Sequence, residues 1–118
     1  MNYLSIIFII TLLFPFNTMA MAKTFIWQCQ VSHINDKKQT NGKISQYKID
    51  VTTPMVWFGN ETRWSGFVNT EYKYDTENNN LYSISKPWDG IYELETRTII
   101  FTNKDSNLKV LYKCKELD

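Results

Sequence analysis

Apolar and polar side chains alternate along most of the chain after residue 22, which is the pattern of half-buried β-strands. In the first such segment, Phe25, Trp27, Cys29 and Val31 share one parity, and mainly polar residues occupy the other. No window of about a dozen residues carries the spacing of an amphipathic helix. The pattern therefore predicts an all-β fold.

Residues typical of turns divide this part of the chain into eight or nine short strands, with turn signals roughly every eight to twelve residues. This spacing is typical of a small antiparallel eight-stranded barrel or a sandwich. We expect strands around residues 25–31, 47–51, 55–58, 63–68, 71–75, 81–85, 91–95, 98–102 and 108–115.

The interior of such a small barrel should be filled by large side chains, which leaves little room for a bulky ligand. Every second residue of the predicted strands should point inward and supply these side chains. The expected interior residues are Trp27, Tyr47, Ile49, Val51, Phe101, Val110 and Tyr112.

Residues 1–22 carry no charged side chain and contain an apolar run over residues 4–14. This run has the length of a signal-peptide core and is short for a membrane span. A proline ends it, and Ala20 and Ala22 give the small-x-small pattern that signal peptidase accepts. We expect a signal peptide over 1–22 and a single β domain over 23–118, with no stable membrane insertion after cleavage. Cleavage after Ala20 and retention as an uncleaved anchor are the alternatives.

Export would place Cys29 and Cys114 in an oxidising compartment, the periplasm or the cell exterior, where they are expected to pair. Each cysteine follows an aromatic residue by two positions, Trp27 and Tyr112, so equivalent positions of the first and last strands would be joined. Those strands should then be neighbours. Closing so long a loop would stabilise the fold by on the order of 4 kcal/mol. Two buried free thiols or a redox pair are the alternatives.

The charge of the chain excludes some functions. Thirteen Lys and Arg residues against twelve Asp and Glu give a formal net charge of +1, too little to hold nucleic acid by electrostatics. One histidine and two cysteines are too few for a closed zinc site. We therefore predict no nucleic-acid partner, no metal and no cofactor.

A catalytic centre is not predicted either. His33 is the single histidine and precedes a polar run, without a nucleophile-elbow or zinc-protease motif elsewhere. The rival hypothesis is a small hydrolase that uses a carboxylate such as Asp75, Asp89 or Glu93. We expect no catalytic residue and a protein that is not an enzyme.

Aromatic residues gather at predicted loops and strand ends in the middle of the chain. Such rings are either lids over the core or anchors for a protein partner, and Trp and Arg are frequent anchors. Trp88 is the best candidate for an exposed ring, because it falls in a predicted turn between Pro87 and Gly90. Arg63, Trp64 and Trp88 are therefore candidate partner-binding residues.

The outline of the chain resembles small exported, disulfide-containing bacterial β-proteins, and among them the membrane-bound and periplasmic inhibitors of C-type lysozyme. The shared features are the early aromatic-x-Cys, the strand over 47–51 with a following Val-Trp pair, and the final Tyr-x-Cys. The resemblance implies an eight-stranded barrel and a Ser-Gly-x-x-aromatic loop that enters the lysozyme cleft. Ser65 and Gly66 match this loop and are added to the candidate partner-binding residues. Asn69 stands where the aromatic residue would be, and the family's second glycine-containing motif is missing.

We therefore expect an exported, non-enzymatic binding module of the bacterial envelope, acting as an inhibitor or immunity-type protein against a lysozyme-like or other cell-wall hydrolase. A secreted effector or virulence protein is the main alternative, and the carboxylate-dependent hydrolase is a second one.

Overall fold

The computed structural model describes residues 24–60 and 62–117, so the predicted signal peptide lies outside the described residues. Within these ranges the regular secondary structure consists of β-strands alone, which confirms the all-β prediction. The ten strands of the described ranges are β1 (Thr24–Ile34), β2 (Lys37–Lys38), β3 (Ile44–Asp50), β4 (Met55–Asn60), β5 (Arg63–Gly66), β6 (Glu71–Asp75), β7 (Asn80–Ile84), β8 (Trp88–Glu93), β9 (Thr98–Asn103) and β10 (Leu108–Leu117).

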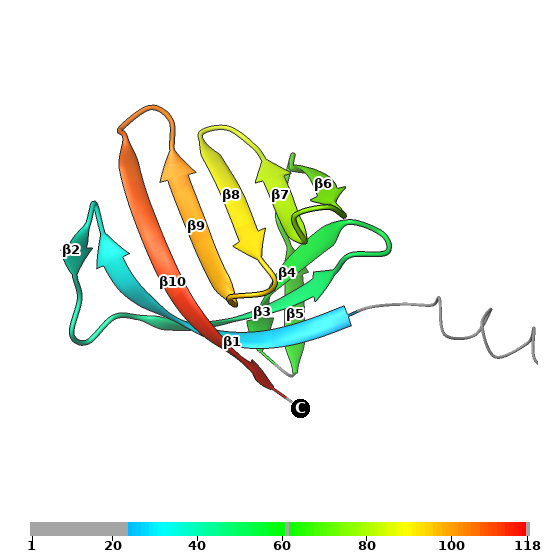
Figure 1. Ribbon diagram of the computed structural model, residues 1–118, viewed down its shortest axis with the longest axis horizontal. Helices are drawn as coiled ribbons and strands as arrows, with labels where there is room; N and C mark the ends of the chain where they lie inside the picture. Colours follow the sequence, from blue (N-terminus) through cyan, green and yellow to red (C-terminus); the bar gives the residue numbers. More distant parts are fainter. Residues whose placement is uncertain (1–23, 61, 118) are drawn as a thin grey trace, which may run out of the picture.

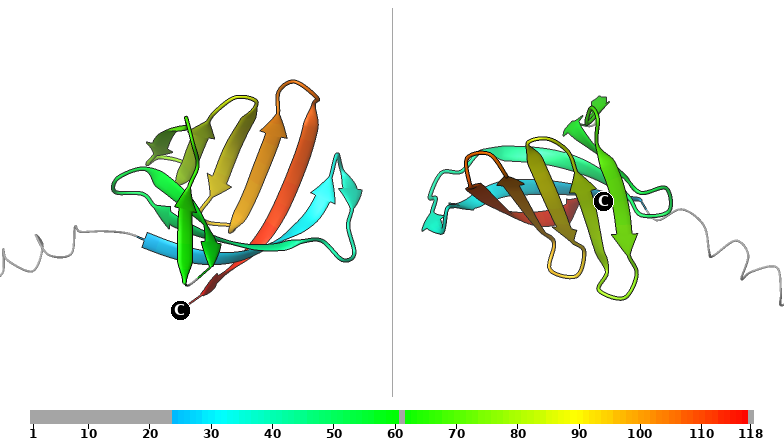
Figure 2. Two further views of the ribbon diagram at one scale, coloured as in Figure 1. Left: turned by 180° about the vertical axis from the view of Figure 1, so that it is seen from behind. Right: turned by 90° about the horizontal axis from the view of Figure 1, so that it is seen from above.

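The strands form one antiparallel sheet in the order β5-β4-β3-β1-β10-β9-β8-β7-β6, with β2 paired to β1. The sheet curls into a half-barrel (Figures 1 and 2). We call β5, β4, β3 and β1 the first wing, and β10 to β6 the second wing. The first and last strands are neighbours, as predicted, and they join the two wings at the middle of the sheet.

The strand count and the closure differ from the eight-stranded prediction. The two ends of the strand order are β5 and β6, which follow each other in the sequence. A side chain bridges the wings near this opening, because the Tyr72 hydroxyl of β6 donates to the Val56 carbonyl of β4 at 3.3 Å. This hydrogen bond therefore links the two wings at the open side of the curled sheet.

Three hairpin loops of the second wing share one backbone feature. The residue just before the next strand adopts a positive φ of 54° at Asn79, 54° at Arg97 and 57° at Asn107. Asparagine enters this left-handed region more readily than most residues. Consecutive strands are thereby joined by short loops that fix their register.

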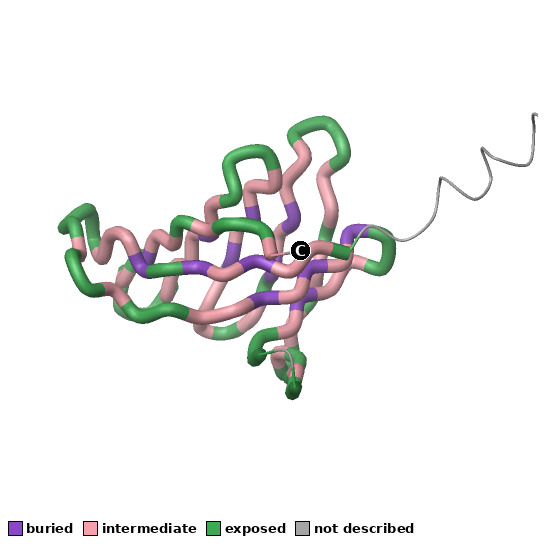
Figure 3. The backbone as a smooth tube through the Cα atoms, turned by 90° about the horizontal axis from the view of Figure 1, so that it is seen from below, coloured by how far each residue is buried: buried purple, intermediate pink, exposed green. Residues whose placement is uncertain are grey.

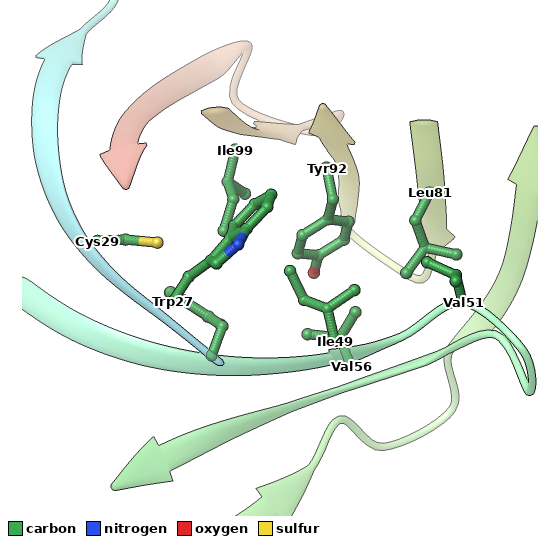
Figure 4. Packing of buried hydrophobic residues seen from close by; sticks show 9 residues of the cluster. Trp27, Cys29, Ile49, Val51, Val56, Leu81, Tyr92 and Ile99 are labelled. Atoms are coloured by element: carbon green, nitrogen blue, oxygen red, sulfur yellow. The ribbon is translucent and has the colours of Figure 1, made fainter. Parts of the chain in front are cut away.

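The core lies on the inner face of the curled sheet, where buried positions recur at every second residue of the strands (Figure 3). Trp27 and Ile49 from the first wing point toward Tyr92 and Ile99 from the second (Figure 4). Six of the seven predicted interior residues belong to this core or pack against it, and the seventh, Val110, is also buried. The core residues that the sequence pattern did not single out are Val56, Leu81, Tyr92 and Ile99.

Candidate functional site

A hollow of about 390 Å³ opens on the inner face of the second wing. Its volume lies near the lower end of the range for small-ligand pockets. Its walls are mainly aromatic and its rim carries hydroxyl groups and two charged groups. The residues that line the hollow are Phe67, Val68, Thr70, Ser83, Ser85, Lys86, Trp88, Asp89, Tyr92, Phe101, Val110 and Tyr112.

A glycine permits the close packing at one side of the hollow. Gly90 of β8 is paired with Ser83 of β7 and with Phe101 of β9. A Cβ atom at residue 90 would lie 2.9 Å from Phe101 Cε1 and would also collide with the Ser83 Oγ atom. The sequence pattern places Gly90 in a turn, but it is a buried residue within β8. A glycine inside a strand is a known sign of such close approach.

The Phe101 ring is the centre of an aromatic cluster. Its centroid lies 5.6 Å from Tyr112, 5.8 Å from Tyr92, 6.2 Å from Tyr47 and 6.5 Å from Phe67. Tyr112 and Tyr92 meet it edge to face, at 84° and 85°. Such pairs contribute about 0.5–1.5 kcal/mol each beyond simple burial. The wall is thus built from rings of both wings that hold one another in place.

Two tyrosines of this cluster, Tyr47 and Tyr92, are neutral at physiological pH. Burial raises the pKa of Tyr92 far above its usual value, and the Ser83 hydroxyl offsets part of that effect. Burial also raises the pKa of Tyr47, with a further rise from the neighbouring Tyr112. A buried phenol keeps its proton because burial disfavours the charged form.

Of the two charged residues that line the hollow, Asp89 forms an ion pair within the described part of the chain and Lys86 does not. Asp89 Oδ1 lies 3.2 Å from Lys104 Nζ. Lys86 is exposed and forms no ion pair with any described residue. The turn that carries it is fixed at its ends, since Ser85 Oγ donates to the Trp88 carbonyl at 2.6 Å.

The predicted partner-binding residues separate into two places. Trp88 lines the hollow and is half-buried, not the exposed ring that a turn position predicts. Arg63, Trp64, Ser65 and Gly66 form β5, at the edge of the first wing, and none of the four lines the hollow.

The ring of Trp64 contacts a lysine on the other face of the sheet. It lies 5.4 Å from Lys48 Nζ, and the same ammonium group is 4.6 Å from the Trp57 ring. Lys48 and Trp57 face each other in the sheet register, on the face opposite to the Tyr47 and Phe58 pair. Trp64 therefore belongs to a cation–π cluster on the outer face of the first wing.

The segment that follows β5 connects these two places. Phe67, Val68 and Thr70 come directly after Ser65 and Gly66 and line the hollow. Phe67 packs on Phe58 with ring centroids 4.8 Å apart. The predicted Ser65 and Gly66 thus lie next to this wall, whereas Phe67 and Val68, which line it, are not among the predicted partner-binding residues.

The residues considered for catalysis have structural partners. His33 lies in β1, its Nδ1 atom hydrogen-bonded to the Ser32 hydroxyl. Asp75 caps its own turn by accepting the Asn78 side-chain amide at 2.8 Å, and this bond lowers the pKa of the carboxyl. Asp89 pairs with Lys104.

The described part of the chain contains no cluster of three or more potential metal-ligating side chains and no helix of the length and hydrophobicity needed to cross a membrane. Comparisons of the chain with protein-family models, with curated protein sequences and with solved structures found no match.

Proposed function

We propose that this protein is an exported, non-enzymatic binding module that holds a protein partner at the mouth of the hollow, and that the partner is a lysozyme-like or other cell-wall hydrolase. The observation that carries the proposal is an aromatic hollow beside exposed apolar side chains. Val68 is 80% exposed and lines the hollow, and Phe58, packed on Phe67, is 41% exposed. Exposed apolar groups next to a concave aromatic site are typical anchors for a protein partner.

The ionisable groups around the hollow favour binding over catalysis. The Asp89 carboxylate is paired with a lysine, and the buried Tyr92 hydroxyl stays protonated. A general acid or base needs a pKa near the working pH, and burial moves the pKa of Tyr92 away from that range.

The disulfide supports export and a rigid binding surface. Cys29 and Cys114 are joined across β1 and β10, and such bonds persist in oxidising compartments. A wall that is already ordered loses little conformational entropy when a partner binds. This suits an inhibitor or immunity-type protein that must act outside the cytoplasm.

The Ser65-Gly66 pair supports a hydrolase as the partner. In lysozyme inhibitors, which this chain resembles in outline, a Ser-Gly loop enters the enzyme cleft. Here the same pair leads directly into Phe67 and Val68 at the mouth of the hollow.

The test is binding of the protein, secreted by cells that express the full chain, to C-type lysozyme and to a panel of bacterial cell-wall hydrolases. We expect one member to bind at micromolar concentration and to lose activity in the complex. Val68→Asp should weaken that complex about tenfold or more, because it places a charge in an apolar contact.

Ile44→Asp is the matched control. Ile44 is 56% exposed at the start of β3 and does not line the hollow. An equal effect of both substitutions would contradict the proposed site, and absence of binding across the panel would remove the hydrolase as the partner.

A further inference from the structure

The charges at the rim of the hollow do not balance. Lys86 and Asp89 are the charged residues among those that line it. The Asp89 carboxylate already has the Lys104 ammonium 3.2 Å away. Lys86 has no ionic partner among the described residues, so the rim presents one uncompensated positive charge to whatever enters.

Hydroxyl groups line the same hollow as this charge. Thr70, Ser83 and Ser85 line the same hollow as Lys86. The Thr70 and Ser85 hydroxyls donate to the carbonyls of Val68 and Trp88. Their side chains still add polar surface to the hollow, which reduces the cost of removing a carboxylate from water there.

The rest of the hollow is apolar and small. Its space of about 390 Å³ is walled by Phe67, Trp88 and Phe101 among others. This space suits one aromatic ring or branched alkyl group and is small for a long lipid chain. Aromatic walls favour an aromatic guest, because offset and edge-to-face contacts add to the burial.

We propose that the hollow binds an aromatic side chain that lies next to a carboxylate on the partner protein, with the ring between the aromatic walls and the carboxylate at Lys86. This inference rests on the proposed function and names the group by which the partner is held. Charge complementarity selects the acidic neighbour, and the exposed Val68 beside the mouth offers apolar contact to the flanking chain.

The experiment measures binding of short peptides, capped at both ends, to the secreted protein by amide chemical-shift changes. Four matched peptides carry Phe-Glu, Phe-Gln, Phe-Lys or Ala-Glu at the centre. A single ring gives weak binding, roughly in the millimolar range. We expect the Phe-Glu peptide to bind about two- to fivefold more tightly than Phe-Gln, Phe-Lys to bind more weakly still, and Ala-Glu to show no saturable shift.

The shifts should fall on the backbone amides around the hollow, such as those of Ser83, Lys86 and Gly90. Lys86→Glu should reverse the order, so that Phe-Lys binds best, whereas Lys38→Glu should leave it unchanged. Lys38 is an exposed lysine on β2 and does not line the hollow. Equal affinities for Phe-Glu and Phe-Gln, or shifts located elsewhere, would overturn the inference.

The two proposals can fail separately. If the peptides follow the expected order while no hydrolase binds, the ligand class stands and the hydrolase proposal fails. If a hydrolase binds through Val68 but the peptides show no charge preference, the inference about Lys86 fails while the proposed function stands.

Discussion

Cys29 on β1 and Cys114 on β10 lie directly opposite each other in the sheet, with Cα atoms 4.0 Å apart and a disulfide between them. They are 85 residues apart in the sequence. The bond joins the two strands at which the first and second wings meet. It therefore restrains the junction between the two wings of the sheet.

Removing this bond should cost the domain much of its stability. We expect the double substitution Cys29→Ala and Cys114→Ala to lower the free energy of unfolding by about 4 kcal/mol, because a long loop is no longer closed in the unfolded chain. Chemical denaturation of the purified, disulfide-bonded protein measures the change. Treatment of the wild-type protein with a reductant should produce a similar loss, and an unchanged denaturation midpoint in both experiments would contradict the prediction.

Gly90→Ala should destabilise the fold and distort the hollow. The new methyl group would press on Phe101 Cε1, 2.9 Å away, and on the Ser83 hydroxyl. Overpacking of this kind costs about 1–3 kcal/mol, which chemical denaturation would detect. Gly66→Ala is the matched control on β5, where the added Cβ would be 3.2 Å from the flexible end of Met55. Similar losses for both variants would argue against the steric explanation.

The outer-face cluster should contribute a measurable interaction energy. Lys48→Met keeps most of the apolar stem but removes the ammonium that lies 4.6 Å from the Trp57 ring. We expect a loss of about 0.5–1 kcal/mol in unfolding free energy. A double-mutant cycle with Trp57→Leu isolates this energy, and strictly additive effects of the two substitutions would show that the contact contributes nothing.

Stability should fall at alkaline pH. The folded-state pKa values of Tyr47, Tyr72 and Tyr92 are raised above the usual tyrosine value of 10.0, chiefly by burial. The unfolded chain therefore loses these protons at lower pH than the folded chain does. Their contribution to stability is fully present below pH 10 and is lost as the pH rises further.

Denaturation measured over a series of alkaline pH values checks this dependence. In the folded protein, tyrosinate absorbance should also show a group of phenols that ionise only at a pH above the usual tyrosine pKa. Tyr92→Phe should reduce the slope of stability against pH, whatever its effect at neutral pH. A slope that is the same in both proteins would contradict the assignment of Tyr92.

Local patterning was enough to predict the strands and the cysteine pair. The alternation around Trp27 and Tyr47 depends on neighbouring residues, since successive side chains of a strand point to opposite faces. The matching parity of Cys29 and Cys114 then predicted that the first and last strands are neighbours, and the sheet register confirms it.

The hollow could not be predicted in the same way. Phe67, Trp88 and Phe101 are distant in the sequence and line one space only because the second wing curls and the segment after β5 crosses toward it. The sequence pattern makes both Trp64 and Trp88 candidate partner-binding residues, but the sheet register places Trp64 on the outer face, whereas Trp88 lines the hollow.

The sequence by itself determined the β-class of this protein, the parity of its core and the pairing of its cysteines, because these depend on a two-residue period and on the two available sulfur atoms. The tertiary structure alone decided which rings share the hollow, why residue 90 is a glycine and that Lys86 stands at the rim without an ionic partner among the described residues. Those features depend on how strands far apart in the sequence are packed, and packing at the inner face follows from the curvature of the whole sheet.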